Sequence, residues 1–344
     1  MQTTNSLRPL ATNDSPVVVH LHFHKRRTGV TTSLEQVLPF LSQHTEVYVL
    51  GSAVRWPSLS CPHFIRLAFG SRSLVVHAHR NNELLFAWAL RFLGARFRLV
   101  ATRHSATTPS RWTRFLFSRA EFVIRLTPDV SDSFPRPTTY VPHGVDPAQW
   151  PEGLFKSNDS LVGRRKEILM MGRIRPAKGQ DTFVEAVCRF LPQFPDWKAT
   201  IVGRVDDYSF AHKLKTRIEK AGLTGQVQWI EETGQIGDRL RSAGIVVIPS
   251  RSEGFSMVCL EAMVSGCTVV ATREVGIHSA VITSPSLGYL FPVDDAEELS
   301  ERLYLLARGS LLNPQEVRKH IVTQWFAEKT ALGLLQAYGL KMNT

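Results

Sequence analysis

The chain has 344 residues, and because a domain typically holds about 150 residues, this length predicts two domains. Its hydrophobic fraction of 43% is ample for two cores, and 41 Lys and Arg against 30 Asp and Glu give a net charge of +11, which indicates an anionic partner such as phosphates, nucleic acid or a membrane surface. The four cysteines form no Cys-x-x-Cys pair, which argues against a disulfide framework or a thiolate zinc site.

The first half alternates between strand-like and helix-like segments after a polar tail at residues 1–15, which we expect to be disordered. Short β-rich runs predict strands at residues 17–23, 46–50, 74–78, 97–102, 122–125 and 139–141. Helical periodicity predicts helices at residues 32–41, 83–93 and 111–117. Such alternation is typical of a doubly wound parallel α/β sheet, so we expect a Rossmann-like first domain over residues 16–147.

The alternation restarts after a turn-rich stretch at residues 148–163, which is predicted to be a linker. The second set of strands is expected at residues 168–171, 198–202, 227–230, 245–248 and 268–271, and its helices at 181–190, 211–221 and 296–307. Residues 164–313 therefore predict a second α/β domain, and two such domains would face each other across a ligand-binding cleft. The final segment, residues 314–344, is helical; its periodicity leaves its placement open, and packing back on the first domain is one arrangement.

A charged residue interrupts an otherwise apolar helix in the second half. Residues 257–264 are apolar except for Glu261, and the run lies between Ser256, a good helix N-cap, and Gly266, a good terminator. This pattern predicts a buried helix. Because burying an unpartnered carboxylate costs several kcal/mol, Glu261 is expected to have a partner from the protein or from a ligand.

Two segments of the second half have the composition of an anion site. Arg173 and Lys178 follow a strand in the loop that begins at Gly172, where two cations suit a diphosphate, although an ordinary exposed basic loop is the simpler alternative. The loop Gly254-Phe255-Ser256 leads into the buried helix, and backbone N–H groups at a helix start bind anions. Glu253 precedes this helix, and because a carboxylate repels a diphosphate, its natural targets are hydroxyl groups.

With these motifs, the sequence resembles the retaining, GT-B-fold glycosyltransferases of family four. Residues 249–266 match the Glu-x7-Glu motif of that family, and the likeness extends to the Gly-Arg and Lys-Gly pairs of residues 172–179, to residues 141–146 and to residues 288–295. The resemblance implies that Glu253 contacts hydroxyls of the donor sugar and that Glu261 holds the nucleotide ribose. It also implies that Arg173 and Lys178 bind the donor diphosphate in place of a metal ion, so neither a metal nor a cofactor is expected.

The first half is similar in its loops to lipopolysaccharide core mannosyltransferases, on the evidence of residues 25–33 and 77–83. This likeness implies mannose transfer from GDP-mannose to the Kdo-lipid A region, with the first domain on the acceptor side. In the wider family a loop here represented by Thr28 and Gly29 touches the donor phosphate, and a histidine here represented by His104 lies against the sugar. The family's Gly-Gly-x-Pro-Glu loop reads differently at residues 276–280, so a UDP-sugar donor and another glycolipid or polysaccharide acceptor form the alternative.

Histidines repeat at alternate positions near two predicted strands. The first set is His20, His22 and His24 on one side of the first strand, and the second is His77 and His79. Imidazoles two residues apart can chelate zinc, but strands in the middle of such a sheet are buried on both faces. Hydrogen-bonded or acceptor-facing histidines are therefore the favoured interpretation, and no metal site is predicted.

The positive charge is concentrated in the first half, where residues 1–160 hold 18 basic and 10 acidic side chains, against 23 and 20 in residues 161–344. Residues 111–119 mix arginines with Trp and Phe, which is typical of a helix on an anionic bilayer; a core-facing helix with a solvated basic face is the alternative. The N-terminus lacks a secretory signal pattern, and no window reaches about 18 apolar residues. We expect a cytoplasmic protein, peripheral on the inner face of the bacterial inner membrane.

Three other functions fit parts of the sequence. A basic protein that binds nucleic acid or a membrane without turnover fits the charge, although no nucleic-acid motif is present and no nucleic-acid partner is predicted. A nucleotide-sugar epimerase or a sugar phosphorylase fits the two α/β domains. An epimerase would convert the donor without an acceptor, and a phosphorylase would need a lysine-bound pyridoxal phosphate.

Overall fold

The structure is a computed structural model that describes residues 16–128, 134, 136, 138–150, 166–231, 236–309 and 311–340. The expected disordered tail at residues 1–15 and most of the expected linker at 148–163 lie outside the described residues. The chain divides into two compact units, here called unit 1 (Met1–Pro142 with Ala327–Thr344) and unit 2 (His143–Phe326). Each unit is an α/β domain with one parallel sheet, as the alternation of strands and helices predicts.

Unit 1 is built on a six-stranded sheet in the order β2-β1-β3-β4-β5-β6, and every pair of neighbours is parallel. Its strands are β1 (Val17–Leu21), β2 (Glu46–Leu50), β3 (Leu74–Ala78), β4 (Arg98–Arg103), β5 (Phe122–Arg125) and β6 (Thr138–Tyr140). Its helices are α1 (Gly29–Leu41), α2 (Cys61–Phe69), α3 (Asn81–Phe92), α4 (Arg111–Phe117) and α12 (Ala327–Tyr338). Central strands β1 and β3 are fully buried because helices cover both faces of a parallel sheet.

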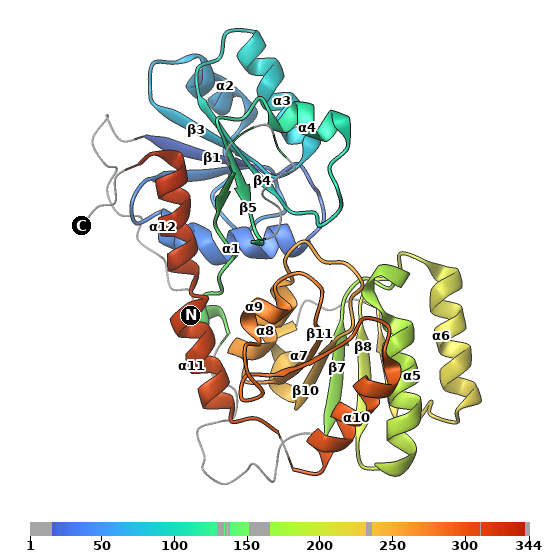
Figure 1. Cartoon of the computed structure of the whole chain (residues 1–344). Helices are drawn as coiled ribbons and strands as arrows, with labels where there is room; N and C mark the ends of the chain where they lie inside the picture. The colour runs from blue at the N-terminus through green and yellow to red at the C-terminus, as the bar shows by residue number, and fades with distance from the viewer. Residues whose placement is uncertain are drawn as a thin grey trace, which may run out of the picture. The chain divides into compact units, whose positions relative to one another are not determined.

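Unit 2 repeats the architecture with the strand order β12-β11-β10-β7-β8-β9, again entirely parallel. Its strands are β7 (Glu167–Met171), β8 (Lys198–Val202), β9 (Val227–Ile230), β10 (Ile245–Ile248), β11 (Thr268–Thr272) and β12 (Tyr289–Phe291). Its helices are α5 (Gln180–Phe190), α6 (Tyr208–Lys220), α7 (Ile236–Ser242), α8 (Met257–Val264), α9 (His278–Val281), α10 (Ala296–Ala307) and α11 (Pro314–Gln324). Figure 1 shows α5, α6 and α10 on one face of this sheet and α7 and α8 on the other.

Several elements differ from the prediction, and each difference has a local cause. Helix α2 was not predicted; its nine residues mix buried Phe64 and Ala68 with exposed Ile65 and Phe69, so apolar side chains do not mark a single face. Strand β1 ends at Leu21, two residues before the predicted end, so His22 lies in the following loop. The three-residue strand β12 and the four-residue helix α9 are too short to show a period.

The C-terminal segment, which was expected to be helical, is two helices that belong to different units. Helix α11 ends at Gln324 in unit 2, and α12 begins at Ala327 in unit 1. Within unit 1, α12 packs along α1. Gly333 of α12 lies so close to Val141 that a Cβ added to this glycine would be 3.0 Å from a methyl group of Val141. Unit 1 is therefore completed by the last helix of the chain, which the predicted boundaries of 16–147 and 314–344 placed in separate segments. No helix among the described residues has the length and apolar character needed to cross a bilayer.

Candidate functional site

The loops that carry the predicted donor-binding residues of unit 2 are neighbours. The first loop follows β7 and the second follows β10, and these strands are adjacent and parallel, so both loops leave the same edge of the sheet. The backbone N–H of Arg251 donates to the Ala177 carbonyl at 3.0 Å. Gly179 has φ +70°, and a Cβ there would lie 1.9 Å from the Pro249 carbonyl oxygen. Only glycine permits this approach, which brings Lys178 to the loop that carries Glu253.

Lys178 and Glu253 form a part-buried ion pair. Lys178 Nζ lies 2.5 Å from Glu253 Oε1, and the Ser250 hydroxyl donates to the same oxygen at 2.7 Å. Burial opposes ionisation of Glu253, but the ammonium group of Lys178 and the Ser250 hydroxyl outweigh it and hold the pKa of that carboxyl below its ordinary value. The carboxylate is therefore charged at neutral pH, with a lysine fixed beside it.

Arg173, the second predicted cation, has a different acidic partner. Arg173 Nη1 lies 3.1 Å from Asp206 Oδ2, and Asp206 also accepts from Arg204 at 2.7 Å. The Arg173 side chain is 49% exposed, so its contact is weak and its guanidinium can reorient. Asp206 lies beyond the next strand and belongs to no recognisable motif, so it was not among the predicted site residues.

A second arginine, which the sequence reasoning overlooked, ties the two loops together. Arg251 donates two parallel hydrogen bonds to Asp181, at 2.9 and 2.8 Å, and its Nε donates to Asp294 at 2.6 Å. Asp181 lies in the first turn of α5, and Asp294 has a left-handed backbone with φ +65°. A bidentate guanidinium held on two carboxylates is rigid, so Arg251 fixes the loop that leads to Glu253.

Helix α8 has the predicted bounds, but Ser256 does not cap it as predicted. Ser256 has φ +96° and ψ +71°, and its side chain makes no capping bond to the helix. Instead, its hydroxyl contacts His278 Nε2 at 3.0 Å, while His278 Nδ1 lies 2.8 Å from the Thr272 carbonyl. A carbonyl can only accept, so Nδ1 carries the proton and Nε2 accepts from Ser256. The left-handed turn, which costs a non-glycine residue energy, is thus supported by a buried histidine.

The remaining predicted residues around α8 are buried. Glu261 is 5% exposed, in agreement with the predicted buried helix. Phe255 is also buried; its ring packs edge-on against His143 with centroids 4.9 Å apart, and its carbonyl accepts from Ile277. The side chain of Phe255 is therefore engaged in packing within unit 2.

In unit 1, Thr28 is the N-cap of α1 and Gly29 is its first residue. The Thr28 N–H donates to Thr31 Oγ1 at 3.0 Å, and Arg80 Nη2 lies 3.5 Å from the Thr28 hydroxyl. A Cβ at Gly29 would have no heavy atom within 4 Å, so packing does not require glycine there.

His104 follows β4 and is half-buried, and its Nε2 lies 3.0 Å from Nδ1 of His79. Possible metal-ligand atoms of three histidines, His20, His77 and His79, lie within 4.8 Å of one another. These histidines are hydrogen-bonded: His20 contacts His79 directly, and His77 contacts other side chains. His22 and His24 do not join them, contrary to the expected alternation, because β1 ends before both residues. They contact Thr31 and the backbone of residue 26 instead.

Glu83 is a buried acidic residue to which the sequence reasoning gave no role. Its carboxylate accepts from the backbone N–H of Phe23 at 3.0 Å and of His79 at 2.7 Å. Burial raises the pKa of this carboxyl against the effect of those two hydrogen bonds. Glu83 thus joins the loops after β1 and β3, which carry the histidines.

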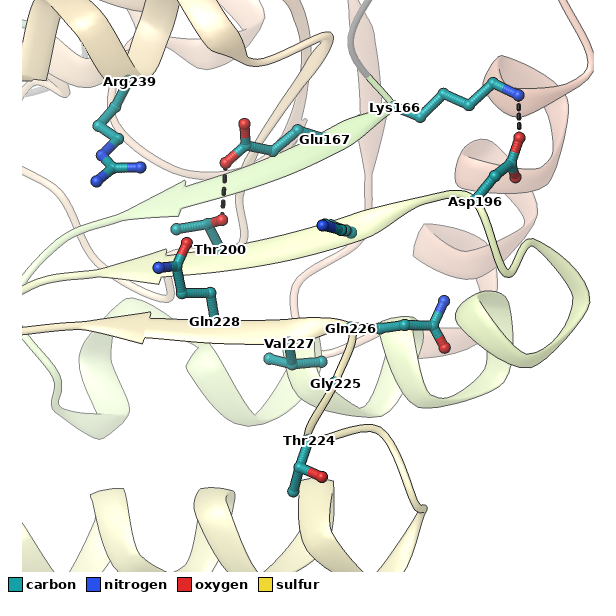
Figure 2. A pocket seen from close by; sticks show the side chains of 11 residues that line it. Lys166, Glu167, Asp196, Thr200, Thr224, Gly225, Gln226, Val227, Gln228 and Arg239 are labelled. Carbon is teal, nitrogen blue, oxygen red and sulfur yellow. Dashed lines mark hydrogen bonds and ion pairs between the residues drawn. The ribbon is translucent and has the colours of Figure 1, made fainter.

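A hollow of about 570 Å³ lies elsewhere in unit 2, at the amino ends of β7, β8 and β9. Figure 2 shows two contacts among the side chains that line it, Glu167 with Thr200 and Lys166 with Asp196. Because the predicted donor-binding loops leave the carboxyl ends of β7 and β10, this hollow is at the opposite edge of the sheet. It contains none of the predicted site residues.

Comparisons with known proteins identify the family. The family model described as "Glycosyl transferases group 1" matches residues 155–322. The lipopolysaccharide core biosynthesis mannosyltransferase LpsB of Rhizobium meliloti is 33% identical over 82% of this chain and 84% of its own length. The chain belongs to the group 1 glycosyltransferases. Another relative in this family, the core biosynthesis mannosyltransferase LpcC of Rhizobium leguminosarum bv. viciae, is 31% identical over 83% and 84% of the two chains.

Solved structures share the fold. Anabaena Alr3699/HepE, solved in complex with UDP and glucose, has a TM-score of 0.78 at 16% identity and covers 94% of this chain and 99% of its own. Sucrose-phosphate synthase from Thermosynechococcus elongatus has a TM-score of 0.74 at 17% identity over 94% and 98%. At such identity the likeness establishes the fold alone, which is the predicted GT-B fold of two Rossmann-like domains.

Proposed function

We propose that the protein is a retaining, metal-independent family-four hexosyltransferase that moves mannose from GDP-mannose to the Kdo-lipid A region of the lipopolysaccharide core. The observation that carries this proposal is the similarity to two core biosynthesis mannosyltransferases along more than four fifths of this chain. A family-four transferase that uses a UDP-sugar is the alternative, since the loop at residues 276–280 departs from the family pattern.

In the proposed reaction, the bond between the anomeric carbon and the diphosphate oxygen breaks, and the acceptor hydroxyl oxygen bonds to the same face of that carbon. The acceptor's proton passes to the leaving phosphate oxygen, so no base on the enzyme and no glycosyl-enzyme intermediate are required. Negative charge develops on the diphosphate, and preorganised cations and helix N–H groups stabilise such charge. A glycosyl group trapped on Glu253 or Glu261 and identified by mass spectrometry would refute this mechanism.

We assign the diphosphate of the donor to Lys178, Arg173, the loop at Gly172 and the N–H groups of Gly254, Phe255 and Ser256. The ion pair with Glu253 supports the role of Lys178, because it holds the ammonium group in one place before the donor binds. Arg173 is half-exposed on a surface contact, which leaves it free to turn toward a phosphate.

Glu253 is assigned to sugar hydroxyls and Glu261 to the ribose. In unit 1, we assign Thr28 and Gly29 at the start of α1 to the donor phosphate and His104 to the sugar. These assignments rest on the family motif, and the start of α1 supplies N–H groups suited to an anion.

Donor and acceptor are tested together by incubating the protein with a panel of GDP- and UDP-sugars and Kdo-containing lipid A, and by following the mass of the glycolipid. We expect a gain of one hexose with GDP-mannose. A gain only with a UDP-sugar would replace mannose transfer by the alternative. Conversion of the sugar without an acceptor would indicate an epimerase, and RNA binding without any turnover would refute the enzyme assignment.

The assignment of Glu261 is tested by Glu261→Gln, which keeps the size of the side chain. Because hydrogen bonds to a charged group contribute about 1.5–3 kcal/mol, we expect GDP to bind about 10- to 150-fold more weakly, as measured by calorimetry, with little loss of thermal stability. Unchanged GDP binding with a large loss of stability would instead indicate a purely structural carboxylate.

We further propose that unit 1 binds the anionic face of the cytoplasmic membrane through α3 and α4. Large apolar side chains on these helices face solvent: Phe92 is 83% exposed, Leu93 at the end of α3 is 69% exposed, and Trp112 is 52% exposed. Arginines accompany them, and Arg119 lies over the Phe115 ring with its guanidinium carbon 4.6 Å from the centroid. Exposed aromatic residues among cations suit an anionic bilayer surface.

Cosedimentation with vesicles tests this surface. We expect the wild-type protein to bind vesicles that contain anionic lipid and to be released by salt, and Phe92→Ser with Trp112→Ser to weaken binding at least tenfold. The matched control is Tyr208→Ser, because Tyr208 is 78% exposed but lies in unit 2. Equal losses for both variants, or no binding by the wild type, would refute the proposal.

A further inference from the structure

Six side chains of unit 1 form one continuous line of hydrogen-bonding contacts through its interior. We call this line the histidine chain, and in order its members are Thr102, His77, Tyr338, His20, His79 and His104. The successive distances are 2.7 Å, 2.7 Å, 3.4 Å, 3.1 Å and 3.0 Å, so the contact between Tyr338 and His20 is the longest.

The members of the histidine chain come from four separate segments. His20 lies on β1, His77 on β3 and Thr102 on β4, and the parallel register of these strands places His20 directly beside His77. Helix α12 adds Tyr338, which is fully buried. All members except His104 are buried, so water does not compete with these contacts.

Burial, with a smaller contribution from neighbouring histidines, lowers the pKa of His20 to about 3 and that of His79 well below its ordinary value, so both imidazoles are neutral. A neutral imidazole has one N–H and one lone pair, so a ring that uses both nitrogens donates with one and accepts with the other. Once the direction of one hydrogen bond is known, the directions of the others follow from it.

Thr102 decides that direction. Among the described residues, His77 Nε2 is the one hydrogen-bonding partner of the Thr102 hydroxyl. If Thr102 donates to Nε2, its hydroxyl hydrogen is satisfied. If Nε2 donated instead, the hydroxyl hydrogen would be left without an acceptor in a buried site, which is the costlier arrangement. Thr102 is therefore the donor end of the chain.

From this end the geometry points to one tautomer for the last residue. We propose that the histidine chain sets His104 as the neutral ring with its proton on Nδ1 and with Nε2 accepting from His79. Thr102, His77, Tyr338, His20 and His79 are then positioning residues. The inference deepens the proposed function, on which its catalytic consequence rests: any contact of His104 Nδ1 with a substrate oxygen would be made by an N–H donor, not by an acceptor.

A divalent metal bound by His20, His77 and His79 is the alternative to the histidine chain, and the two arrangements exclude each other. A metal needs the lone pair of each ligating nitrogen. In the histidine chain, by contrast, Nδ1 of His20 and Nε2 of His79 form a hydrogen bond at 3.1 Å, which occupies both nitrogens. Because the histidine chain engages both ring nitrogens of all three residues, zinc bound by His20, His77 and His79 would break the chain before it reaches His104.

The tautomers are measured in the free, full-length protein by long-range ¹H–¹⁵N NMR of ¹⁵N-labelled histidine, with the His104 signals assigned by their loss in His104→Gln. We expect Nδ1 of His104 to be protonated in the wild type. In Thr102→Val, which keeps the shape of the side chain, the bias of about 5- to 150-fold toward this tautomer should disappear. Tyr338→Phe should act in the same way because it removes the middle link.

The matched control is Thr200→Val, since Thr200 is an equally buried strand threonine of unit 2. It should leave the His104 signals unchanged. A wild-type protein with the proton on Nε2, an unchanged tautomer in Thr102→Val, or stoichiometric zinc held by the wild type would each overturn the proposal. Because the NMR measurement needs no substrate, it separates failure of this inference from failure of the proposed transferase activity, which shows instead as absence of glycolipid product.

Discussion

The contact between Lys178 and Glu253 makes a quantitative prediction, because a part-buried ion pair should couple measurably. The two side chains are 17% and 14% exposed, and their charged atoms lie 2.5 Å apart. Charges about 4 Å apart attract by about 4 kcal/mol at an effective dielectric constant of about 20, and desolvation cancels part of this energy. We therefore expect a coupling free energy of about 1–3 kcal/mol between the two residues.

The coupling is measured by a double-mutant cycle with Lys178→Met, Glu253→Gln and the double variant. Amide hydrogen exchange of β8, in the core of unit 2, reports the free energy of unfolding of that unit by itself. The matched control is the cycle of Lys166→Met and Asp196→Asn, an ion pair of the same unit whose side chains are 52% and 54% exposed. Solvent screening should leave this second pair without measurable coupling.

A coupling between Lys178 and Glu253 as small as that expected for the exposed pair would refute the reasoning, because it would show that Glu253 does not hold Lys178 in solution. The pH dependence gives an independent check. Glu253 has a lowered pKa in the folded protein, so the pair's contribution is complete above the ordinary carboxyl value of 4.5 and is lost as the pH falls through the lowered value. A contribution lost at higher pH would contradict the assigned direction.

Three further predictions concern single residues. His278→Ala should destabilise unit 2 by about 1–3 kcal/mol in urea unfolding, because the strained Ser256 loses its hydrogen-bonding partner. A smaller loss of stability would contradict the role of His278. Gly179→Ala should lower the thermal stability more than Gly222→Ala does. Both glycines have φ near +70°, but only at Gly179 would the new Cβ clash with a backbone oxygen. Equal losses of stability would refute the close approach of Gly179 to Pro249. Because the pKa of His20 falls from 6.5 to about 3 on folding, the unfolded chain takes up the proton first, and His20 by itself should lower the stability of unit 1 by about 1.4 kcal/mol per pH unit as the pH falls from 6.5 toward 3; the same total slope in wild type and His20→Gln would refute this.

Much of the local structure and the family follow from the sequence alone. The alternating apolar runs predicted both parallel sheets, and helices 111–117 and 296–307 have the predicted bounds because their apolar faces repeat with a clear helical period. The Glu-x7-Glu motif indicated the glycosyltransferase family, since its residues lie close together along the chain. Local patterns of this kind are set within one or two elements and need no knowledge of distant contacts.

Contacts between residues far apart in the chain could not be predicted in this way. The sequence showed histidines at alternate positions, but only the register of β1 beside β3 brings His20 to His77, and only the last helix supplies Tyr338 between them. In the same way, Ser256 looked like an ordinary N-cap until His278 was found to hold it in a left-handed turn. A hydrogen bond requires two atoms to lie within about 3 Å of each other. For residues that are far apart in the sequence, the packing of whole strands and helices decides whether they come so close.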